Sequence, residues 1–171
     1  MPIDPAQGSG QFNRLIEPAA NGVFAVRPQQ GVPLRRLLGA QLAAFCKQVD
    51  MGGPEVILDL APALSFATVI NELAVNAAKY GALSVSAGKL LLRWTVDGKS
   101  DPPTLVFLWE ETGGPRVVSR TRAGLGQTDI EEMARDLGKF RIDYTWCRLK
   151  FELEVPLDKV RFSQATKETI K

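Results

Sequence analysis

Apolar side chains recur every three to four residues in three stretches of the chain, which predicts three amphipathic helices. The first covers about residues 33–48 and the second about 62–80, while the third begins near residue 128 and is closed by Gly138. The second helix is the longest and carries a polar stripe beside its apolar face. This stripe consists of Thr68, Glu72, Asn76 and Lys79.

Shorter segments alternate between apolar and polar residues, as half-buried strands do. They cover residues 56–60, 89–96, 104–109, 140–146 and 149–155. A turn cluster, Asp-Gly-Lys-Ser-Asp-Pro-Pro at 97–103, predicts a hairpin between the second and third of them. The order of elements predicts an α+β fold, a two-layer α/β sandwich in which helices pack on one face of an open mixed sheet.

The length of 171 residues predicts a single domain with ragged ends. Residues 1–30 are expected to be a flexible leader, because their first part is rich in Pro, Gly and polar residues. The folded domain is expected over residues 31–158, followed by a charged tail at 159–171.

Composition excludes several classes of function. The chain has 21 basic and 19 acidic residues and no dense Lys/Arg block, so nucleic-acid binding is not expected. We find no uncharged apolar run of about 18 residues and no secretory signal pattern, so we expect a cytoplasmic protein without membrane insertion. Cys46 and Cys147 lack the paired spacing of a metal site and are expected to be buried reduced thiols.

The sequence contains no histidine. This removes the commonest metal ligand, the Ser/His and Cys/His catalytic pairs, and any phosphohistidine formed from these residues. Most hydrolase functions are therefore excluded. A phosphoryl group can reach a histidine only if another polypeptide supplies that histidine.

The most informative segment is 71–84, Asn-Glu-Leu-Ala-Val-Asn-Ala-Ala-Lys-Tyr-Gly-Ala-Leu-Ser. One helix face there combines carboxylate, carboxamide and ammonium groups, which suits a magnesium nucleotide. The carbonyl oxygen of an Asn can bind the hard cation, and a lysine can contact phosphate oxygens. The alternative is a helix with a solvated polar side, which composition alone favours.

Segment 71–84 resembles the N box of HWE histidine kinases, a group among the ATPases and kinases that share the Bergerat nucleotide-binding fold. Residues 109–115, Trp-Glu-Glu-Thr-Gly-Gly-Pro, are similar to the first glycine box of that family, and Gly-Leu-Gly at 124–126 is similar to its second. Each glycine motif alone is weak, and a Gly-x-Gly before a helix can be a simple turn. Three motifs in the family's order make coincidence a poor explanation.

The resemblance implies ATP and Mg²⁺ as cofactors and a role for each matched residue. Glu72 stands where the family has its general base, and Asn76 where it has a Mg²⁺ ligand. Lys79 and Tyr80 would lie along the phosphates and the sugar. Glu111 matches the acidic residue that accepts a hydrogen bond from the adenine amino group. In the first glycine box, Gly113 and Gly114 would let the backbone approach the base. In the second, Gly124, Leu125 and Gly126 would let it approach the phosphates.

Two positions depart from the family pattern. Asn71 replaces the histidine just before the N-box glutamate, and its carboxamide cannot titrate near neutral pH. Asp129 stands where the family has an apolar residue. With Glu131 and Glu132 it is expected to place three acids in the first turn of the phosphate-facing helix, where they would compete with an anionic ligand.

Three functions remain open. The first is the Mg-ATP-binding catalytic domain of an HWE-type two-component histidine kinase, whose implied partners are a histidine-containing dimerisation domain or phosphotransfer protein and a response-regulator receiver domain. The leader would then hold a remnant of the dimerisation helix. The second is a degenerate kinase domain that acts as a regulatory or scaffold module, as Asn71 and Asp129 suggest. The third, a chaperone- or repair-type ATPase of the same broad fold, is disfavoured by the kinase-like motifs.

Overall fold

The computed structural model describes residues 31–115, 125–145 and 148–162, with backbone alone over 125–129. The expected leader at 1–30, Gly124 and residues 163–171 of the expected tail lie outside the described residues.

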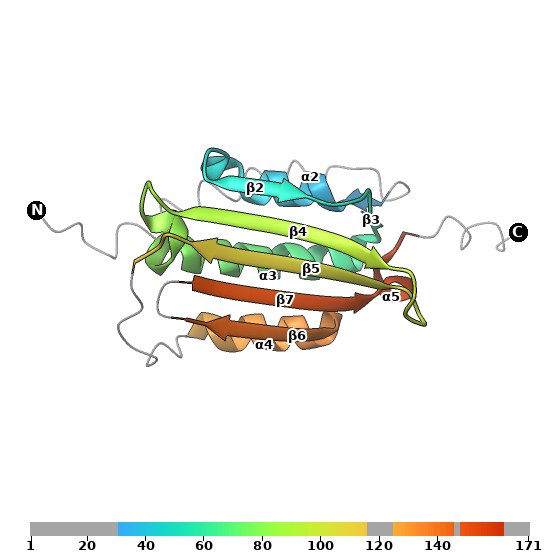
Figure 1. Ribbon diagram of the computed structural model, residues 1–171. Coiled ribbons are helices and arrows are strands. Elements are labelled where there is room, and N and C mark those ends of the chain that lie inside the picture. Colours follow the sequence, from blue (N-terminus) through green and yellow to red (C-terminus); the bar gives the residue numbers. More distant parts are fainter. Residues whose placement is uncertain (1–30, 116–124, 146–147, 163–171) are drawn as a thin grey trace, which may run out of the picture.

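The described chain forms two layers, a five-stranded sheet and a layer of helices (Figure 1). The strands follow the order β2-β4-β5-β7-β6, where β2 runs parallel to β4 and every other pair is antiparallel. Their bounds are Val49–Gly52 for β2, Lys89–Asp97 for β4, Thr104–Thr112 for β5, Lys139–Tyr144 for β6 and Arg148–Pro156 for β7. The sheet is therefore open and mixed, as predicted.

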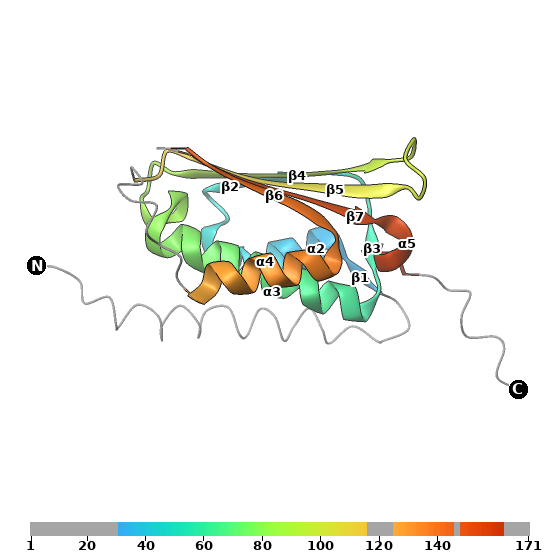
Figure 2. The same cartoon turned by 90° about the horizontal axis from the view of Figure 1, so that it is seen from below.

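Three helices lie together on one side of the sheet (Figure 2). They are α2 (Leu34–Gln41), α3 (Leu60–Tyr80) and α4 (Leu125–Leu137). Short elements complete the described fold: β1 (Val32–Pro33) paired with β3 (Ile57–Leu58), the 3-10 turns Ala43–Phe45 and Ala82–Ser84, and α5 (Leu157–Val160). The predicted two-layer α+β fold, with helices on one face of the sheet, is confirmed.

Helix α3 lies at the centre of the helical layer and carries much of the core. The Asp59 carboxylate caps its start by accepting a hydrogen bond from the Leu60 N–H at 2.9 Å, and Gly81 ends it. Phe66 and Ile70 are fully buried, and the Phe66 ring meets the ring of Phe107 on β5 edge to face at 5.2 Å. Among the described helices, α3 is also long and apolar enough, by length and composition alone, to cross a membrane.

Three predictions near the start of the domain are wrong. Cys46, expected to be buried, is exposed, because it follows the 3-10 turn Ala43–Phe45, in which no residue is buried. The helix expected over 33–48 stops at Gln41, and the chain turns to add Val49–Gly52 as edge strand β2. Packing of Val49 and Met51 against the core stabilises this strand, which local helical spacing did not reveal. The strand expected at 56–60 is only the two-residue β3, which pairs with β1 outside the main sheet.

The described chain remains attached to the fold beyond residue 158. Val160 is buried, its carbonyl oxygen accepts the Asp59 N–H at 2.8 Å, and the Phe162 N–H donates to Ile57 O at 2.9 Å. The folded part thus continues to Phe162, because these hydrogen bonds hold the chain beside β3.

Candidate functional site

The first component of the site is a charged residue at the end of an apolar row. Alternate residues of β5 face the helices, and Phe107 and Trp109 on that face are fully buried. Glu111 continues the same row and is 4% exposed. Among residues whose side chains are described, it is the one charged residue that is buried.

Both oxygens of the Glu111 carboxylate accept hydrogen bonds from the protein. The Ala82 backbone N–H donates to Oε2 at 2.9 Å, and the Trp109 indole N–H donates to Oε1 at 3.0 Å. Burial raises the pKa of Glu111 above its ordinary value, while the bonds from Ala82 and Trp109 oppose this shift. A carboxylate can accept about four hydrogen bonds, so acceptor capacity remains for a ligand's amino group.

The hydrogen bond from Ala82 joins the end of α3 to the end of β5. Glycines make this approach possible, because a Cβ on Gly81 would overlap the Glu111 carboxylate and one on Gly114 would lie 2.9 Å from the Ala82 nitrogen. Gly113 has φ +72°, which favours glycine. These glycines therefore bring two parts of the chain together, and their predicted approach to a nucleotide base stays a prediction.

The polar stripe on α3 leads toward this junction. Glu72 and Asn76 are half-buried, while Lys79 and Tyr80 are exposed, the tyrosine by 52%. Because Glu72, Asn76 and Tyr80 follow one another at four-residue spacing, they lie on one helix face. Asn76 precedes Gly81 by five residues, or about 7.5 Å along the helix axis.

The donor set on α3 fits a cation that arrives with a nucleotide. Asn76 offers a carboxamide oxygen, and Mg²⁺ is commonly held by one or two protein oxygens together with phosphate oxygens and water. No group of three or more His, Cys, Asp or Glu that could hold a metal by itself occurs within the described residues. The fit thus depends on oxygens that a ligand supplies.

The start of α4 differs from the sequence prediction. The helix begins at Leu125 instead of near residue 128, so Leu125 and Gly126 belong to its first turn. The expectation of three acids in that turn is wrong, because Asp129 and the two glutamates follow it. Glu131 instead forms a pair with Arg135 at 3.4 Å. An anion at this helix start meets less repulsion than the sequence suggested.

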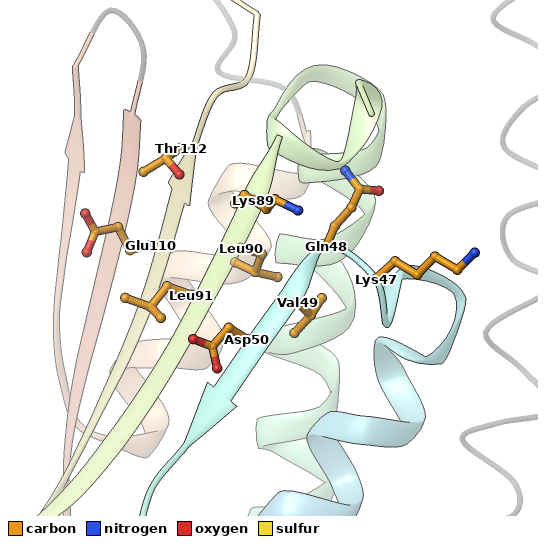
Figure 3. A pocket seen from close by; sticks show the side chains of 9 residues that line it. All are labelled: Lys47, Gln48, Val49, Asp50, Lys89, Leu90, Leu91, Glu110 and Thr112. Atoms are coloured by element: carbon orange, nitrogen blue, oxygen red, sulfur yellow. The ribbon is translucent and has the colours of Figure 1, made fainter. Parts of the chain in front are cut away.

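A hollow of about 410 Å³ lies on the opposite face of the sheet (Figure 3). Its lining comprises Lys47, Gln48, Val49, Asp50, Lys89, Leu90, Leu91, Glu110 and Thr112. Two carboxylates there are already paired, Asp50 with Arg93 at 2.7 Å and Glu110 with Arg148 at 3.0 Å. The hollow contains none of the predicted site residues.

An aromatic residue that the sequence pattern did not single out lies on the helix-facing side of the sheet. Tyr144 ends β6 and is 48% exposed. Burial is the main reason that the pKa of Tyr144 is raised, followed by the negative charges of Glu111 and Glu131. Alternation along the predicted strand at 140–146 was the available signal, but it could not place Tyr144 near Glu111.

Comparison with known proteins identifies relatives over most of the chain. A blue-light-activated histidine kinase of Rhizobium johnstonii is 28% identical over 160 residues, which are 90% of this chain and 45% of that protein. The blue-light-activated histidine kinase of Brucella ovis is 25% identical over 146 residues, 82% of this chain and 30% of that protein. The chain thus spans less than half the length of these relatives. No protein-family profile matches the sequence.

Solved structures share the fold. The histidine kinase domain of the EL346 blue-light-activated histidine kinase from Erythrobacter litoralis matches with a TM-score of 0.64 at 16% identity, covering 92% of this chain and 77% of that one. The Acinetobacter baumannii histidine kinase AdeS matches with a TM-score of 0.53 at 13% identity, covering 92% and 87%. The chain is therefore a distant relative of the blue-light-activated histidine kinases, with the fold of a histidine-kinase catalytic (ATPase) domain.

Proposed function

We propose that this chain is the Mg-ATP-binding catalytic domain of an HWE-type two-component histidine kinase. In this proposal it transfers the γ-phosphoryl group of ATP to a histidine that lies outside these 171 residues, which include none. One observation carries the proposal: the hydrogen bond from the Ala82 N–H to Glu111 joins the N-box and first glycine-box motifs, 29 residues apart, at one point. Similarity to histidine kinases supports it.

The Glu111 carboxylate is the group proposed to recognise the base. It accepts hydrogen bonds and cannot donate them while ionised, so it favours the amino group of adenine over the carbonyl oxygen of guanine. The hydrogen bonds from Ala82 and Trp109 fix its orientation before a ligand arrives. Adenine selection then requires little rearrangement of this side chain.

The polar face of α3 is the proposed site of the phosphates. The carboxamide oxygen of Asn76 would bind Mg²⁺, the Lys79 ammonium would contact phosphate oxygens, and Tyr80 would lie beside the sugar. Glu72, one turn before Asn76, would accept a proton from the attacking imidazole. Bound Mg-ATP supplies the phosphoryl group and a cation that balances its charge. The backbone N–H groups at the start of α4, where Leu125 and Gly126 lie, would contact anionic oxygens.

The proposed partners follow from this chemistry. The acceptor is a histidine on a dimerisation domain or a phosphotransfer protein, and a response-regulator receiver domain takes the phosphoryl group afterwards. We place these events in the cytoplasm, where ATP is supplied.

Isothermal titration of the 171-residue chain with Mg-ADP tests the proposal. The wild type should bind, and Asn76→Ala should abolish the heat of binding. Thr68→Ala is the matched control, because Thr68 lies two turns earlier on the same stripe and bonds only to Leu64 O at 3.0 Å among the described contacts. Glu111→Gln should narrow the preference for ADP over GDP. No binding at millimolar nucleotide would refute the proposal.

A second candidate function is a degenerate kinase domain that acts as a regulatory or scaffold module. Asn71 favours it, since a non-titrating carboxamide replaces the family's histidine beside Glu72. The corrected start of α4 weakens it, because the acids lie beyond the first turn. Absence of nucleotide binding in a folded wild type would favour this second function.

A further inference from the structure

Tyr144 presents a half-exposed aromatic ring on the packed side of the sheet. Its neighbours at alternate positions of β6, Phe140 and Ile142, pack against the core, and so does its cross-strand partner Leu149 on β7. Tyr144 therefore faces the helices. Unlike those neighbours it keeps 48% of its surface exposed, so the ring is available to a ligand on the helix-facing side.

Strand register places Tyr144 in line with Glu111, the proposed base-recognition residue. Leu149 pairs with Glu111 on β5 and with Tyr144 on β6, so the three residues form one row across adjacent strands. Neighbouring strands are about 4.8 Å apart, which puts the backbones of Glu111 and Tyr144 about 10 Å from each other. The apolar side chain of Leu149 forms the floor between them.

Helix α4 bounds the same space from another side. It runs beside β6 (Figure 2), and only Gly138 separates the end of the helix from the start of the strand. The two elements are therefore antiparallel, and the first turns of α4 lie near Tyr144. The raised pKa of Tyr144, caused in part by the charges of Glu111 and Glu131, agrees with this placement.

We infer that the Tyr144 ring contacts the adenine base above Leu149 and forms the far wall of a base-binding groove that begins at Glu111. The inference rests on the proposed function. The ring makes the contact, because every base has an apolar π-face that packs on aromatic side chains. The hydroxyl group is not required, so phenylalanine should serve equally well.

Isothermal titration of the 171-residue chain with Mg-ADP tests this contact. Tyr144→Ala should weaken Mg-ADP binding by about 5- to 150-fold, the range for loss of an aromatic contact to a base. Tyr144→Phe should stay within about twofold of the wild type. Tyr144→Leu, which keeps an apolar cover over the strands and lacks the ring, should behave like the alanine variant and remains informative if alanine impairs folding. Leu64→Ala is the control, since Leu64 is 47% exposed and lies at the other end of α3.

Titration with Mg-GDP distinguishes the ring contact of Tyr144 from the selection of adenine by Glu111. Loss of the ring should weaken ADP and GDP by the same factor, whereas Glu111→Gln should change their ratio. If wild type binds Mg-ADP and Tyr144→Leu binds equally well, the inference is overturned and the proposed function stands. An equal loss in Leu64→Ala would also overturn it. If the folded wild type binds no nucleotide, the proposed function is wrong, and the contact between Tyr144 and adenine is wrong as well.

Discussion

Replacing Trp109 by phenylalanine tests the hydrogen bond that orients Glu111. The change removes the indole N–H that donates to Oε1 at 3.0 Å and leaves one oxygen of a buried carboxylate without this partner. Trp94 provides a matched control, because it is also buried and its indole N–H donates to Pro54 O at 2.7 Å. Both Trp→Phe changes delete the same atoms from the core, so their cavity costs largely cancel in the comparison.

The difference between the two variants follows from the charge of the acceptor. A hydrogen bond to a charged group contributes about 1.5–3 kcal/mol and one to a neutral group about 0.5–1.5 kcal/mol. Near neutral pH, Trp109→Phe should therefore lower the free energy of unfolding by about 1 kcal/mol more than Trp94→Phe does. Urea denaturation followed by far-ultraviolet circular dichroism measures both values without relying on tryptophan fluorescence.

The pH dependence makes the test sharper. The pKa of Glu111 is raised in the folded protein. The stability that this pKa shift contributes is therefore present below the ordinary pKa of 4.5 and is lost as the pH rises through the folded pKa. Loss of the Trp109 donor raises the folded pKa further. The penalty of Trp109→Phe should thus be larger at about pH 8 than at about pH 5, while that of Trp94→Phe stays constant. Equal penalties with the same pH profile would show that the Trp109 indole does not stabilise an ionised Glu111.

Three further predictions concern Gly39, Gly81 and Tyr144. Gly39→Ala should raise the free energy of unfolding by about 0.5–1 kcal/mol, because Gly39 lies in α2 with nothing within 4 Å of an added Cβ. Gly81→Ala should instead lower the free energy of unfolding by about 1–3 kcal/mol, because the added Cβ overlaps the buried Glu111 carboxylate. An unchanged free energy of unfolding would show that Gly81 and Glu111 are not tightly packed. In a Tyr80→Phe background, ultraviolet absorbance should show that the pKa of Tyr144 lies above the ordinary value of 10.0. Glu131→Gln should lower this pKa, and an unchanged pKa would show that Glu131 does not lie near Tyr144.

Strong local periodicity explains which elements the sequence predicted well. Helix α3 and strand β4 have long, regular patterns with clear end signals, and their predicted bounds lie close to those in the structure. The predicted end of β5 falls three residues short of Thr112. Edge strand β2 was missed because it has only four residues and its partner β4 lies some forty residues later in the chain. The apolar spacing of α2 continues through Leu42 and Phe45, so the local pattern predicts a longer helix than the one that ends at Gln41.

The site was predicted as residue types but not as an arrangement. Ending the predicted strand at Trp109 concealed that Glu111 continues the same strand and shares its buried face with the indole. Tyr144 was missed for a related reason, since its alignment with Glu111 depends on pairing among β5, β7 and β6. Local sequence does not determine such register.

In the proposed complex, an adenine nucleotide binds on the helix-facing side of the sheet, at the end of β5. Indole N–H signals in ¹H–¹⁵N correlation spectra, assigned with the Trp→Phe variants, test it directly during titration with Mg-ADP. We predict that the Trp109 indole signal shifts, because its N–H donates to Glu111, and that the Trp94 signal, whose N–H donates to Pro54 O, does not. An unmoved Trp109 signal at saturating nucleotide would show that the nucleotide does not bind beside Glu111.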